Sequence, residues 1–475
     1  MNRALPFLLA LLWLLGCGES AWRPRVVVLV SVDTLRADHL GAYGYPRPTS
    51  TFIDWLAENG VTFERSFAVM PTTAPSHASM LTGLYPLQHG VRRNGERLPD
   101  DARLLPAMLA AAGWDTAGFV STNAHFAASG LDAGFAHFDE PRPGTKERPA
   151  RGTVAIAADW LRGRVSQAPL LLFVHFFDPH SPYQPRKPLV EPPRQRGALA
   201  SYLLNEHHLD PDFFAGNESL MLDLVFAYDG EIRMVDRALR ELYAAVEESV
   251  GLTDSLWILT ADHGEGLGNH GWLLHGKKVY NEQLRVPLVF HAPGRLAPAR
   301  VGAVVDHVDL LPTLLELAGV DGSGLALPGR SLVPLLEGRE DGGGEERFAL
   351  AERRSFDAPE TPRTPPRPLP PRPTVHDLVE AAIHDNFEPG EAWAIQDRRY
   401  KLIVDTTRGD QLFDLSEDPY ETTDLAAERP EIAKRLRARL EARREALRAG
   451  ALRGPVTPVD EASRRALEAL GYIDP

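Results

Sequence analysis

Three continuous runs of mainly apolar residues set the strongest limit on how this chain can fold. A run of this kind is typical of a strand buried on both faces of a parallel sheet, whereas a half-exposed strand alternates apolar and polar residues. The runs are Val26–Val32, Leu170–Phe177 and Ser255–Thr260. Each leads into a loop that carries an aspartate, namely Asp33, Asp178 and Asp262. Carboxylates at the carboxyl ends of central strands are typical of active sites in open α/β sheets.

Helical patterns separate these runs, for example over Thr51–Asn59 and Ala227–Val246. Strands that alternate with helices predict an α/β fold with a mostly parallel, doubly wound sheet flanked by helices. Further along, residues 399–415 have the pattern of a hairpin and Glu428–Ala449 that of a charged helix. These elements predict a small C-terminal α+β subdomain.

Changes in composition suggest the boundaries between the parts of the chain. We expect a catalytic domain over 24–340 and a Gly- and Pro-rich insert or linker over 341–376, which contains a Pro- and Arg-rich stretch. The C-terminal subdomain is expected over 377–455, and residues 456–475 form a tail. Pro-rich stretches of this kind are typical of exposed, extended linkers.

The N-terminus has the pattern of a targeting segment. Arg3 precedes the apolar run Leu5–Leu15, which is too short to span a bilayer comfortably, and Cys17 is the one cysteine of the chain. The ending Leu-Leu-Gly-Cys over 14–17 resembles a bacterial lipoprotein signal, so residues 1–17 are expected to be signal and lipid attachment box. The alternative is a general secretory signal. A lipid on Cys17 would place the protein in the bacterial cell envelope. The expected anchor is the outer membrane, with the protein facing the periplasm or the exterior.

The overall charge narrows the class of partner. The formal net charge is −14 at pH 7, which argues against electrostatic binding to nucleic acid. Such a surface does not attract anionic substrates either, so any anion site must be built locally from metal or basic side chains. The sequence makes no prediction of oligomeric state.

The segment from Pro71 to Gly83 carries the most specific signal. It resembles the active-site signature of the sulfatase family, part of the alkaline phosphatase superfamily, in which Cys or Ser, any residue, then Pro-Ser-Arg lead to Thr-Gly. Thr73 stands at the first position and His77 at the arginine position. In sulfatases the Cys or Ser is oxidised to formylglycine, and threonine is not a known substrate for that conversion. The resemblance therefore implies a sulfatase-like protein that acts on phosphate esters instead of sulfate esters.

Further segments follow in the order expected for the family over nearly all of the chain after the N-terminal segment. They are Ser31–Gly41, Asp178–Tyr183, Tyr228–Ile232, Thr260–Glu265, His275–Lys278, Arg285–Leu288 and Leu412–Glu421. The resemblance implies the alkaline phosphatase-like sulfatase fold.

Asp33, Asp262 and His263 are the candidate metal ligands, together with the Thr73 hydroxyl. Two carboxylates and an imidazole suit a divalent cation such as Ca²⁺, Mn²⁺ or Zn²⁺. Ca²⁺ is the ion most like that of the family, but Thr34 replaces a second family aspartate, and His263 favours a transition metal. A bound cation would activate the Thr73 hydroxyl, which is otherwise a poor nucleophile.

The resemblance assigns other roles around the nucleophile. His77 is expected to support Thr73 by holding a charge or donating a hydrogen bond to its hydroxyl oxygen; capping a helix is its alternative role. His180, His275 and Lys277 are expected to contact the anionic group of the substrate. Alternatively, Asp178 with His180 and His275 completes a second metal site, as in two-metal relatives that use a threonine nucleophile.

These observations predict a metal-dependent hydrolase that cleaves an anionic ester through Thr73, with phosphoesters favoured over sulfate esters. Three alternatives remain open: a sulfuric ester hydrolase similar to arylsulfatases, a transferase that moves a phospho-headgroup onto an envelope acceptor, and a catalytically silent surface binding protein. The retained set of Asp33, Thr73, Asp262 and His263 argues against a silent protein.

Overall fold

The computed structural model describes most of the chain between Trp22 and Ala469. The described residues are 22–122, 125–142, 145–183, 193–205, 207–210, 213–214, 218–339, 346–354, 373–384 and 390–469. The predicted signal over 1–17, with Cys17, lies outside them, as does most of the Pro- and Arg-rich stretch. Within the described ranges, no helix has both the length and the apolar character needed to cross a membrane.

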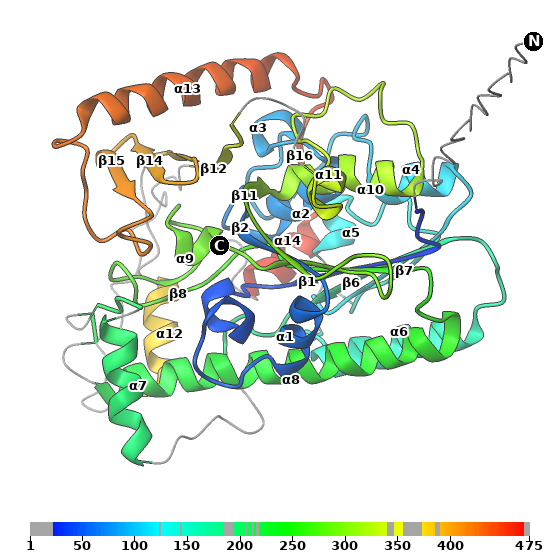
Figure 1. Ribbon diagram of the computed structural model, residues 1–475, viewed down its shortest axis with the longest axis horizontal. Helices are drawn as coiled ribbons and strands as arrows, with labels where there is room; N and C mark the ends of the chain where they lie inside the picture. The colour runs from blue at the N-terminus through cyan, green and yellow to red at the C-terminus, as the bar shows by residue number, and fades with distance from the viewer. Residues whose placement is uncertain are drawn as a thin grey trace, which may run out of the picture.

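A mixed sheet forms the centre of the molecule (Figure 1). In the described part of the chain it has eight strands in the order β11-β2-β10-β7-β1-β6-β4-β5. Their bounds are β1 Val26–Val32, β2 Val61–Phe67, β4 Asp115–Val120, β5 His137–Asp139, β6 Leu170–Phe176, β7 Ser255–Ala261, β10 Leu288–His291 and β11 Ala299–Asp306. β10 is antiparallel to both neighbours, and the other pairs are parallel. The predicted mostly parallel α/β sheet is therefore confirmed.

The three apolar runs of the sequence are the three central strands. β1 pairs in parallel with β6 on one side and with β7 on the other, and Val32 lies opposite Phe176 and Ala261. All residues of these three strands are buried. Because the strands end in register, the loops that follow them leave the sheet at the same edge.

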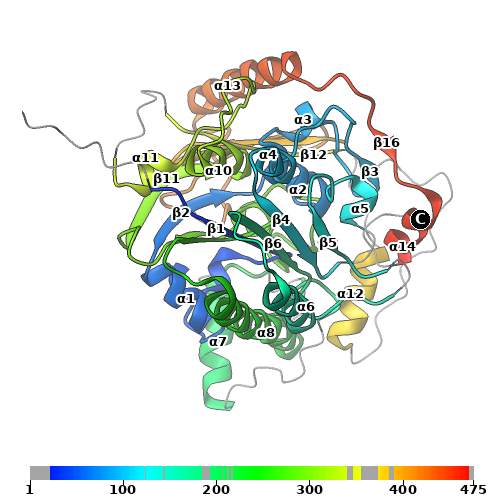
Figure 2. The same ribbon diagram turned by 90° about the vertical axis from the view of Figure 1, so that its right-hand side faces the viewer.

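Helices cover both faces of the sheet, as the two views show (Figures 1 and 2). One face carries α1 (Thr51–Glu58), α6 (Ala150–Gly163) and α8 (Glu218–Val250). The other carries α2 (Thr73–Thr82), α4 (Leu105–Ala111) and α10 (Leu310–Ala318). Alternate residues of β1 enter the two cores: Val28 and Val30 face the first set, and Val27 and Leu29 face the second. Burying such a side chain contributes about 1.5–3 kcal/mol.

Shorter elements connect these layers. They are the 3-10 helices η1 Ala37–His39, η2 Gly41–Tyr43 and η3 His307–Asp309, the helices α3 Pro86–His89, α5 Phe126–Ser129, α7 Pro193–Asn205, α9 Asn281–Leu284, α11 Val333–Leu336 and α12 Val375–His384, and the strands β3 Glu96–Arg97, β8 Gly266–Leu267 and β9 Leu273–Leu274.

The C-terminal subdomain is an antiparallel sheet in the order β12-β13-β14-β15. Its strands are β12 Ala349–Arg353, β13 Ala392–Gln396, β14 Tyr400–Asp405 and β15 Gly409–Asp414, and α13 (Pro430–Ala449) packs against them. β12 corrects the sequence prediction, which placed 341–376 in an insert or linker. This short strand was hidden between Gly/Glu-rich and Pro-rich flanks, but it pairs with β13 and its residues are buried.

The tail after residue 456 returns to the catalytic domain. β16 (Thr457–Pro458) pairs with β3, and α14 (Glu461–Ala469) follows it. Val459 and Leu467 are buried together, with Ala128 and Phe177 packed against them. The tail therefore covers part of the catalytic domain near the loop that follows β6.

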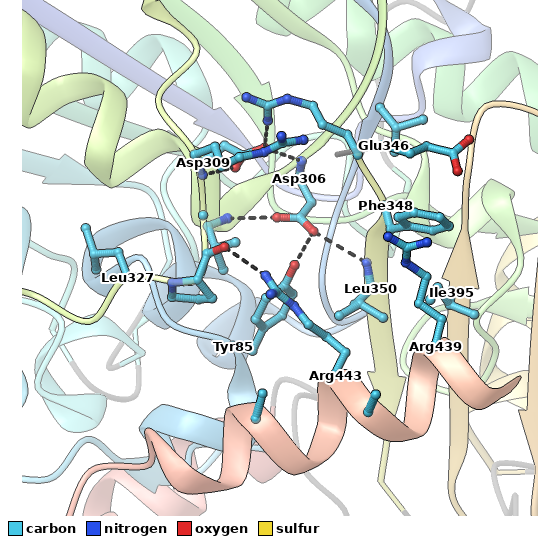
Figure 3. Close-up of a pocket in the computed structure, with 18 residues that line it drawn as sticks. Tyr85, Asp306, Asp309, Leu327, Glu346, Phe348, Leu350, Ile395, Arg439 and Arg443 are labelled. Atoms are coloured by element: carbon cyan, nitrogen blue, oxygen red, sulfur yellow. Dashed lines mark hydrogen bonds and ion pairs between the residues drawn. The ribbon is translucent and has the colours of Figure 1, made fainter. Parts of the chain in front are cut away.

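A cavity of about 510 Å³ lies between the catalytic domain and α13 (Figure 3). Its charged lining includes Asp306, Asp309, Arg330, Arg347, Arg439 and Arg443. The two aspartates flank His307 in and beside η3. This cavity is distinct from the group of residues that the sequence predicted as the active site.

Candidate active site

The three predicted metal ligands come together at the edge of the sheet where β1 and β7 end. Asp33 follows β1, and Asp262 and His263 follow β7; all three are fully buried. His263 Nε2 lies 3.8 Å from Asp33 Oδ1 and 3.6 Å from Asp262 Oδ2. Ligand atoms bound at about 2.1 Å from one cation have separations of this order. The donor set therefore suits a single divalent cation.

The backbone orients Asp262 toward this site. Its Oδ1 accepts the N–H groups of Thr34 at 3.2 Å and of His263 at 2.8 Å. The other oxygen, Oδ2, is buried and has no hydrogen-bond partner among the described residues. Thr34, whose N–H makes one of these bonds, has φ 55°, a strained value for a β-branched residue.

The imidazole of His263 is prepared to act as a ligand. Its Nδ1 lies 2.9 Å from the carbonyl oxygen of Gly264, so Nδ1–H donates to that oxygen and Nε2 keeps its lone pair. Burial lowers the pKa of His263 to about 3, which keeps the ring neutral at pH 7. A neutral imidazole whose second nitrogen is held by a hydrogen bond is the usual metal-binding form.

Thr73 lies at the first position of α2, and Gly83 ends that helix in the left-handed conformation with φ 67°. The Thr73 side chain is fully buried, and its Oγ1 is 3.4 Å from His263 Nε2. The positive end of the helix dipole favours negative charge at this position. The structure therefore places the predicted nucleophile beside the candidate metal ligands.

His77 contacts Thr73 in a different way from the one expected. Its Nδ1 lies 2.9 Å from the main-chain carbonyl oxygen of Thr73, one helical turn earlier, and its Nε2 lies 2.9 Å from Ser31 Oγ. Burial lowers the pKa of His77 to about 3. The ring is therefore neutral, and neither a positive charge nor a hydrogen bond to the Thr73 hydroxyl is present.

His180 and His275 lie on another side of His263. The ring centres of His263 and His275 are 4.4 Å apart, and those of His275 and His180 are 4.9 Å apart. Burial lowers the pKa of both outer rings to about 3, and the charge of Lys277 adds to the effect on His275. Lys277 is therefore near this group, and its side chain is 4% exposed.

Glu265 and Tyr183 support His275, a role that the sequence did not assign. Glu265 Oε1 lies 3.1 Å from His275 Nδ1, and Glu265 Oε2 accepts the Tyr183 hydroxyl at 2.9 Å. Burial raises the pKa of Glu265 to about 7. The family resemblance placed Glu265 beside the metal ligands, but the loop that brings Tyr183 to it gives no local signal.

Asp178 does not complete a second metal site with His180 and His275. Its Oδ2 instead accepts the N–H of Ala150 at 2.7 Å, at the start of α6. A carboxylate at this position is stabilised by the orphan N–H groups of a helix N-terminus. The predicted alternative set is therefore not assembled within the described residues.

His175 was missed by sequence reasoning. It lies inside β6 opposite Ser31, and its Nε2 is 3.7 Å from Asp33 Oδ2. His77, His175 and Asp262 form a second group whose possible ligand atoms all lie within 4.8 Å of one another. The available signal was a histidine within a run otherwise made of apolar residues, three positions before Asp178.

Residues 25–320 of the 475-residue chain match the family described as Sulfatase. The chain belongs to the sulfatase family. A Δ4,5-hexuronate-2-O-sulfatase from Bacteroides thetaiotaomicron is 25% identical to it over 464 residues, which cover 87% of each chain. The multifunctional alkaline phosphatase superfamily protein PehA from Trinickia caryophylli is 25% identical over 490 residues, covering 85% of this chain and 91% of PehA.

Solved structures similar to this sulfatase-family chain include both a sulfatase and a phosphonate monoester hydrolase. A 2-O GAG sulfatase has a TM-score of 0.69 and 20% identity, with 93% of this chain and 96% of that chain covered. The phosphonate monoester hydrolase of Agrobacterium radiobacter has a TM-score of 0.66 and 23% identity. The match covers 90% of this chain and 96% of the hydrolase. The fold is thus the alkaline phosphatase-like sulfatase fold, and it is shared by both classes of enzyme.

This sulfatase-family protein is therefore an ester hydrolase of the alkaline phosphatase superfamily. Enzymes of the family depend on a metal ion, and the buried group of Asp33, Asp262 and His263 suits one. Thr73 occupies the position of the modified Cys or Ser in the family signature that the sequence resembles.

Proposed function

We propose that this sulfatase-family hydrolase cleaves phosphate mono- or diesters by direct attack of the Thr73 hydroxyl. The observation that carries the proposal is the position of Thr73 Oγ1, 3.4 Å from His263 Nε2 at the start of α2. A threonine at this position keeps an oxygen nucleophile without needing conversion to formylglycine. Formylglycine chemistry suits sulfate esters, whereas a plain hydroxyl gives a phosphoenzyme that water can hydrolyse.

The residues divide the reaction between them. Asp33, Asp262 and His263 would hold a divalent cation, which supplies Lewis acidity at the Thr73 oxygen and at the phosphoryl group. Thr73 Oγ forms a bond to phosphorus as the bond from phosphorus to the leaving oxygen breaks. The Thr73 hydroxyl proton is lost to water, and the leaving oxygen takes up a proton from water as the alcohol departs. Water then attacks phosphorus as the bond from phosphorus to Thr73 Oγ breaks. A monoester substrate releases phosphate, a diester releases the remaining phosphate monoester, and the Thr73 hydroxyl is restored.

His180, His275 and Lys277 line the side on which we place the anionic group. His180 donates its Nδ1–H to the carbonyl oxygen of Ser181 at 2.6 Å, which fixes the tautomer of its ring. Glu265 holds His275 in the same way through Nδ1. A protonated phosphate ester would donate a hydrogen bond to Nε2 of such a neutral ring, whereas a ring that takes up a second proton near the phosphate charge would donate from Nε2.

Among the similar proteins, some favour phosphoesters as the substrate of this chain and others favour sulfate esters. PehA is named as multifunctional, and phosphonate monoester hydrolases share the fold, which favours phosphoesters for a chain with this nucleophile. The second candidate is sulfate ester hydrolysis by an unmodified threonine. The sulfatases of Bacteroides thetaiotaomicron and Clostridium perfringens, each 25% identical to this chain, favour it.

The test compares three aryl substrates: p-nitrophenyl phosphate, bis-p-nitrophenyl phosphate and p-nitrophenyl sulfate. Each is offered with Zn²⁺, Mn²⁺ or Ca²⁺ to the wild type, Thr73→Ala and Thr73→Ser. We expect phosphoester turnover that Thr73→Ala abolishes and Thr73→Ser largely keeps, because serine retains the hydroxyl. Acid quenching should trap phosphate on the peptide that contains Thr73. Turnover of the sulfate alone would replace the proposal with the second candidate.

The same experiment separates hydrolysis from the two remaining alternatives. A transferase would give a phosphorylated alcohol when glycerol is added, at the expense of free phosphate. A surface binding protein would show no turnover of any substrate with any of the three ions. Either result would contradict the proposed hydrolase.

We also propose that the enzyme acts at a membrane surface of the bacterial envelope, held by a lipid on Cys17. The proposal rests on the sequence of residues 1–17, which lie outside the described part of the chain. Cys17→Ala should move the protein from the membrane fraction to the soluble fraction. An unchanged distribution would contradict lipid anchoring.

A further inference from the structure

His175 is a buried histidine for which the proposed reaction has no use. Its ring is fully buried, and neither Nδ1 nor Nε2 has a hydrogen-bond partner among the described residues. Burying a polar group without a partner typically costs about 1–3 kcal/mol. A ring in this state needs either a ligand or a compensating charge.

Two neighbours of His175, His77 and Asp262, supply the rest of a ligand set, and Asp33 lies beside them. The ring centres of His77 and His175 are 4.6 Å apart and their planes are nearly perpendicular, at 81°. Asp262 Oδ2, which has no hydrogen-bond partner among the described residues, lies 3.8 Å from His77 Nδ1. Asp33 directs Oδ1 toward His263 and Oδ2 toward His175, at 3.8 and 3.7 Å.

We propose that His77, His175 and Asp262 form a second binding site for a divalent transition-metal ion, beside the Asp33–Asp262–His263 site and sharing Asp262 with it. Two imidazoles and a carboxylate suit Zn²⁺ or Mn²⁺ far better than Ca²⁺, which prefers six to eight oxygen ligands. This set differs from the Asp178, His180 and His275 set considered from the sequence, since Asp178 is bound to the start of α6.

The contacts of His77 fit the tautomer in which Nδ1–H donates to the Thr73 carbonyl oxygen, 2.9 Å away, and Nε2 accepts the Ser31 hydroxyl at 2.9 Å. The metal-binding form is the other tautomer, in which Nε2–H donates to Ser31 Oγ and the ion replaces the proton on Nδ1. Metal binding therefore replaces the hydrogen bond to the Thr73 carbonyl. The metal counts below separate the two tautomers.

Charge explains what a second ion would add, and this part of the inference rests on the proposed function. Asp33 and Asp262 bring two negative charges, and the surrounding imidazoles are neutral. One divalent ion only balances these carboxylates. A second ion gives the site a net positive charge, which stabilises the Thr73 oxygen as it loses its proton and attracts an anionic phosphoryl group.

The test counts metal rather than turnover. Full-length protein is loaded with Zn²⁺, freed of unbound metal and measured by inductively coupled plasma mass spectrometry. We expect two ions per chain in the wild type and one in His175→Gln, His175→Ala and His77→Gln. One ion in the wild type, or two in the His175 variants, would overturn the proposal. Because the count needs no substrate, failure of the proposed phosphoesterase activity would leave it unaffected.

His89 offers a matched control. It is also a fully buried histidine with its pKa lowered to about 3 by burial, but its Nε2 contacts Ser79 Oγ at 3.0 Å and its Nδ1 accepts the N–H of Val91. His89→Gln should lower the melting temperature and still bind two ions. A drop to one ion in this variant would show that general loosening explains the His175 result, and would count against the second site.

A second measurement needs no variant. Wild-type protein loaded with Mn²⁺ should give the exchange-coupled electron paramagnetic resonance signal of two ions that share a carboxylate. A spectrum that at full loading contains the six-line signal of isolated Mn²⁺ and no exchange-coupled signal would overturn the proposal.

Discussion

Two polar regions lie on either side of η3 and differ in how their buried groups are satisfied. On one side, His307 of η3 contacts Ser76 Oγ at 2.9 Å and the carbonyl oxygen of Ala261 at 3.0 Å, next to the candidate metal ligands. On the other side, Asp306 and Asp309 face the 510 Å³ cavity (Figure 3). The cavity is the larger space, whereas the metal-ligand region is the site of the proposed chemistry.

In the cavity, charged side chains contact partners from the protein itself. Arg347 Nη1 donates to Asp309 Oδ2 at 2.9 Å, and Arg443 Nη2 donates to the carbonyl oxygen of Pro328 at 2.8 Å. Arg439 lies over the ring of Phe348, 4.0 Å from its centre. Asp306 accepts the Tyr85 hydroxyl at 2.6 Å. These contacts join the catalytic domain to α13 and to the start of the small sheet.

In the metal-ligand region, buried polar atoms of His175 and Asp262 have no partner within the described residues, and Thr34 Oγ1 is in the same state. A protein tolerates such atoms where a ligand or an ion completes them. The two regions therefore differ in a testable way: the proposed function needs the unsatisfied buried groups, and the cavity side needs only its contacts within the protein. Each prediction below tests one side of this contrast.

The largest effect is expected at Asp262. Asp262→Asn keeps an oxygen for the N–H groups of Thr34 and His263 but replaces the free carboxylate oxygen with an amide nitrogen that cannot bind metal. Loss of the ion removes several kcal/mol of transition-state stabilisation, so kcat/KM should fall by about 10³ or more. Turnover and bound metal measured on the same sample check this.

Asp236 provides the control for that substitution. It is a buried carboxylate that accepts the N–H groups of Phe52 and Ile53 at 2.7 and 2.9 Å, far from the candidate ligands in the sequence. Asp236→Asn should cost stability but keep both metal and turnover. If Asp262→Asn kept its metal and stayed within tenfold of the wild type, the assignment of the metal ligands would be wrong.

A smaller effect is expected along the chain from His275 to Tyr183. His275→Ala should lower kcat/KM about 10²-fold, because a group aimed at the anion is lost. Glu265→Gln should cost about 10-fold through loss of orientation, and Tyr183→Phe less. Steady-state kinetics of the three variants should give this order. Equal losses would instead indicate that the loop fails to fold.

The sequence predicted the metal-ligand region because its parts are local and repeated. Asp33 and Asp262 each follow a run of buried residues, and parallel strands bring their ends to one edge. Thr73 lies in a short motif. His175 was missed because a histidine within a buried run has no distinctive spacing, and its meaning comes from the register of β6 with β1.

The cavity and the small sheet had no comparable signal. Tyr85, Asp309, Arg347 and Arg443 are far apart in the chain, and only tertiary packing brings them together. β12 was hidden by its Gly- and Pro-rich flanks. The predicted contact of His77 with the Thr73 hydroxyl was wrong, because a side chain four residues along a helix reaches back to the carbonyl of that turn instead.

On the cavity side, the expected loss is of stability and not of catalysis. Arg347→Met leaves Asp309 as a buried charge without its ion-pair partner; both side chains are 8% exposed. Breaking such a pair costs about 3–5 kcal/mol of folding free energy. The double variant with Asp309→Asn should recover part of it. Unfolding in urea measures the cost, while kcat/KM of the folded protein should stay within about twofold. A tenfold loss would show that η3 couples the cavity to the metal-ligand region.

The smallest effect is a change in how stability depends on pH. Burial, with the nearby charge of Asp309, raises the pKa of Asp306 to about 7 from its ordinary value near 3.8. Between these values the folded state binds more protons than the unfolded state, so the stability contributed by Asp306 is present below about pH 4 and is lost as pH rises through 7.

Asp306→Asn cannot ionise but keeps an acceptor for Tyr85. The stability of the wild type relative to this variant should therefore fall from pH 5 to 7 by at most about 1.4 kcal/mol per pH unit. Asp405→Asn is the control, because hydrogen bonds from Thr407 lower that pKa against the effect of burial and its titration lies below this range. A flat difference for Asp306→Asn over the same range would show that the carboxylate is already ionised in the folded protein.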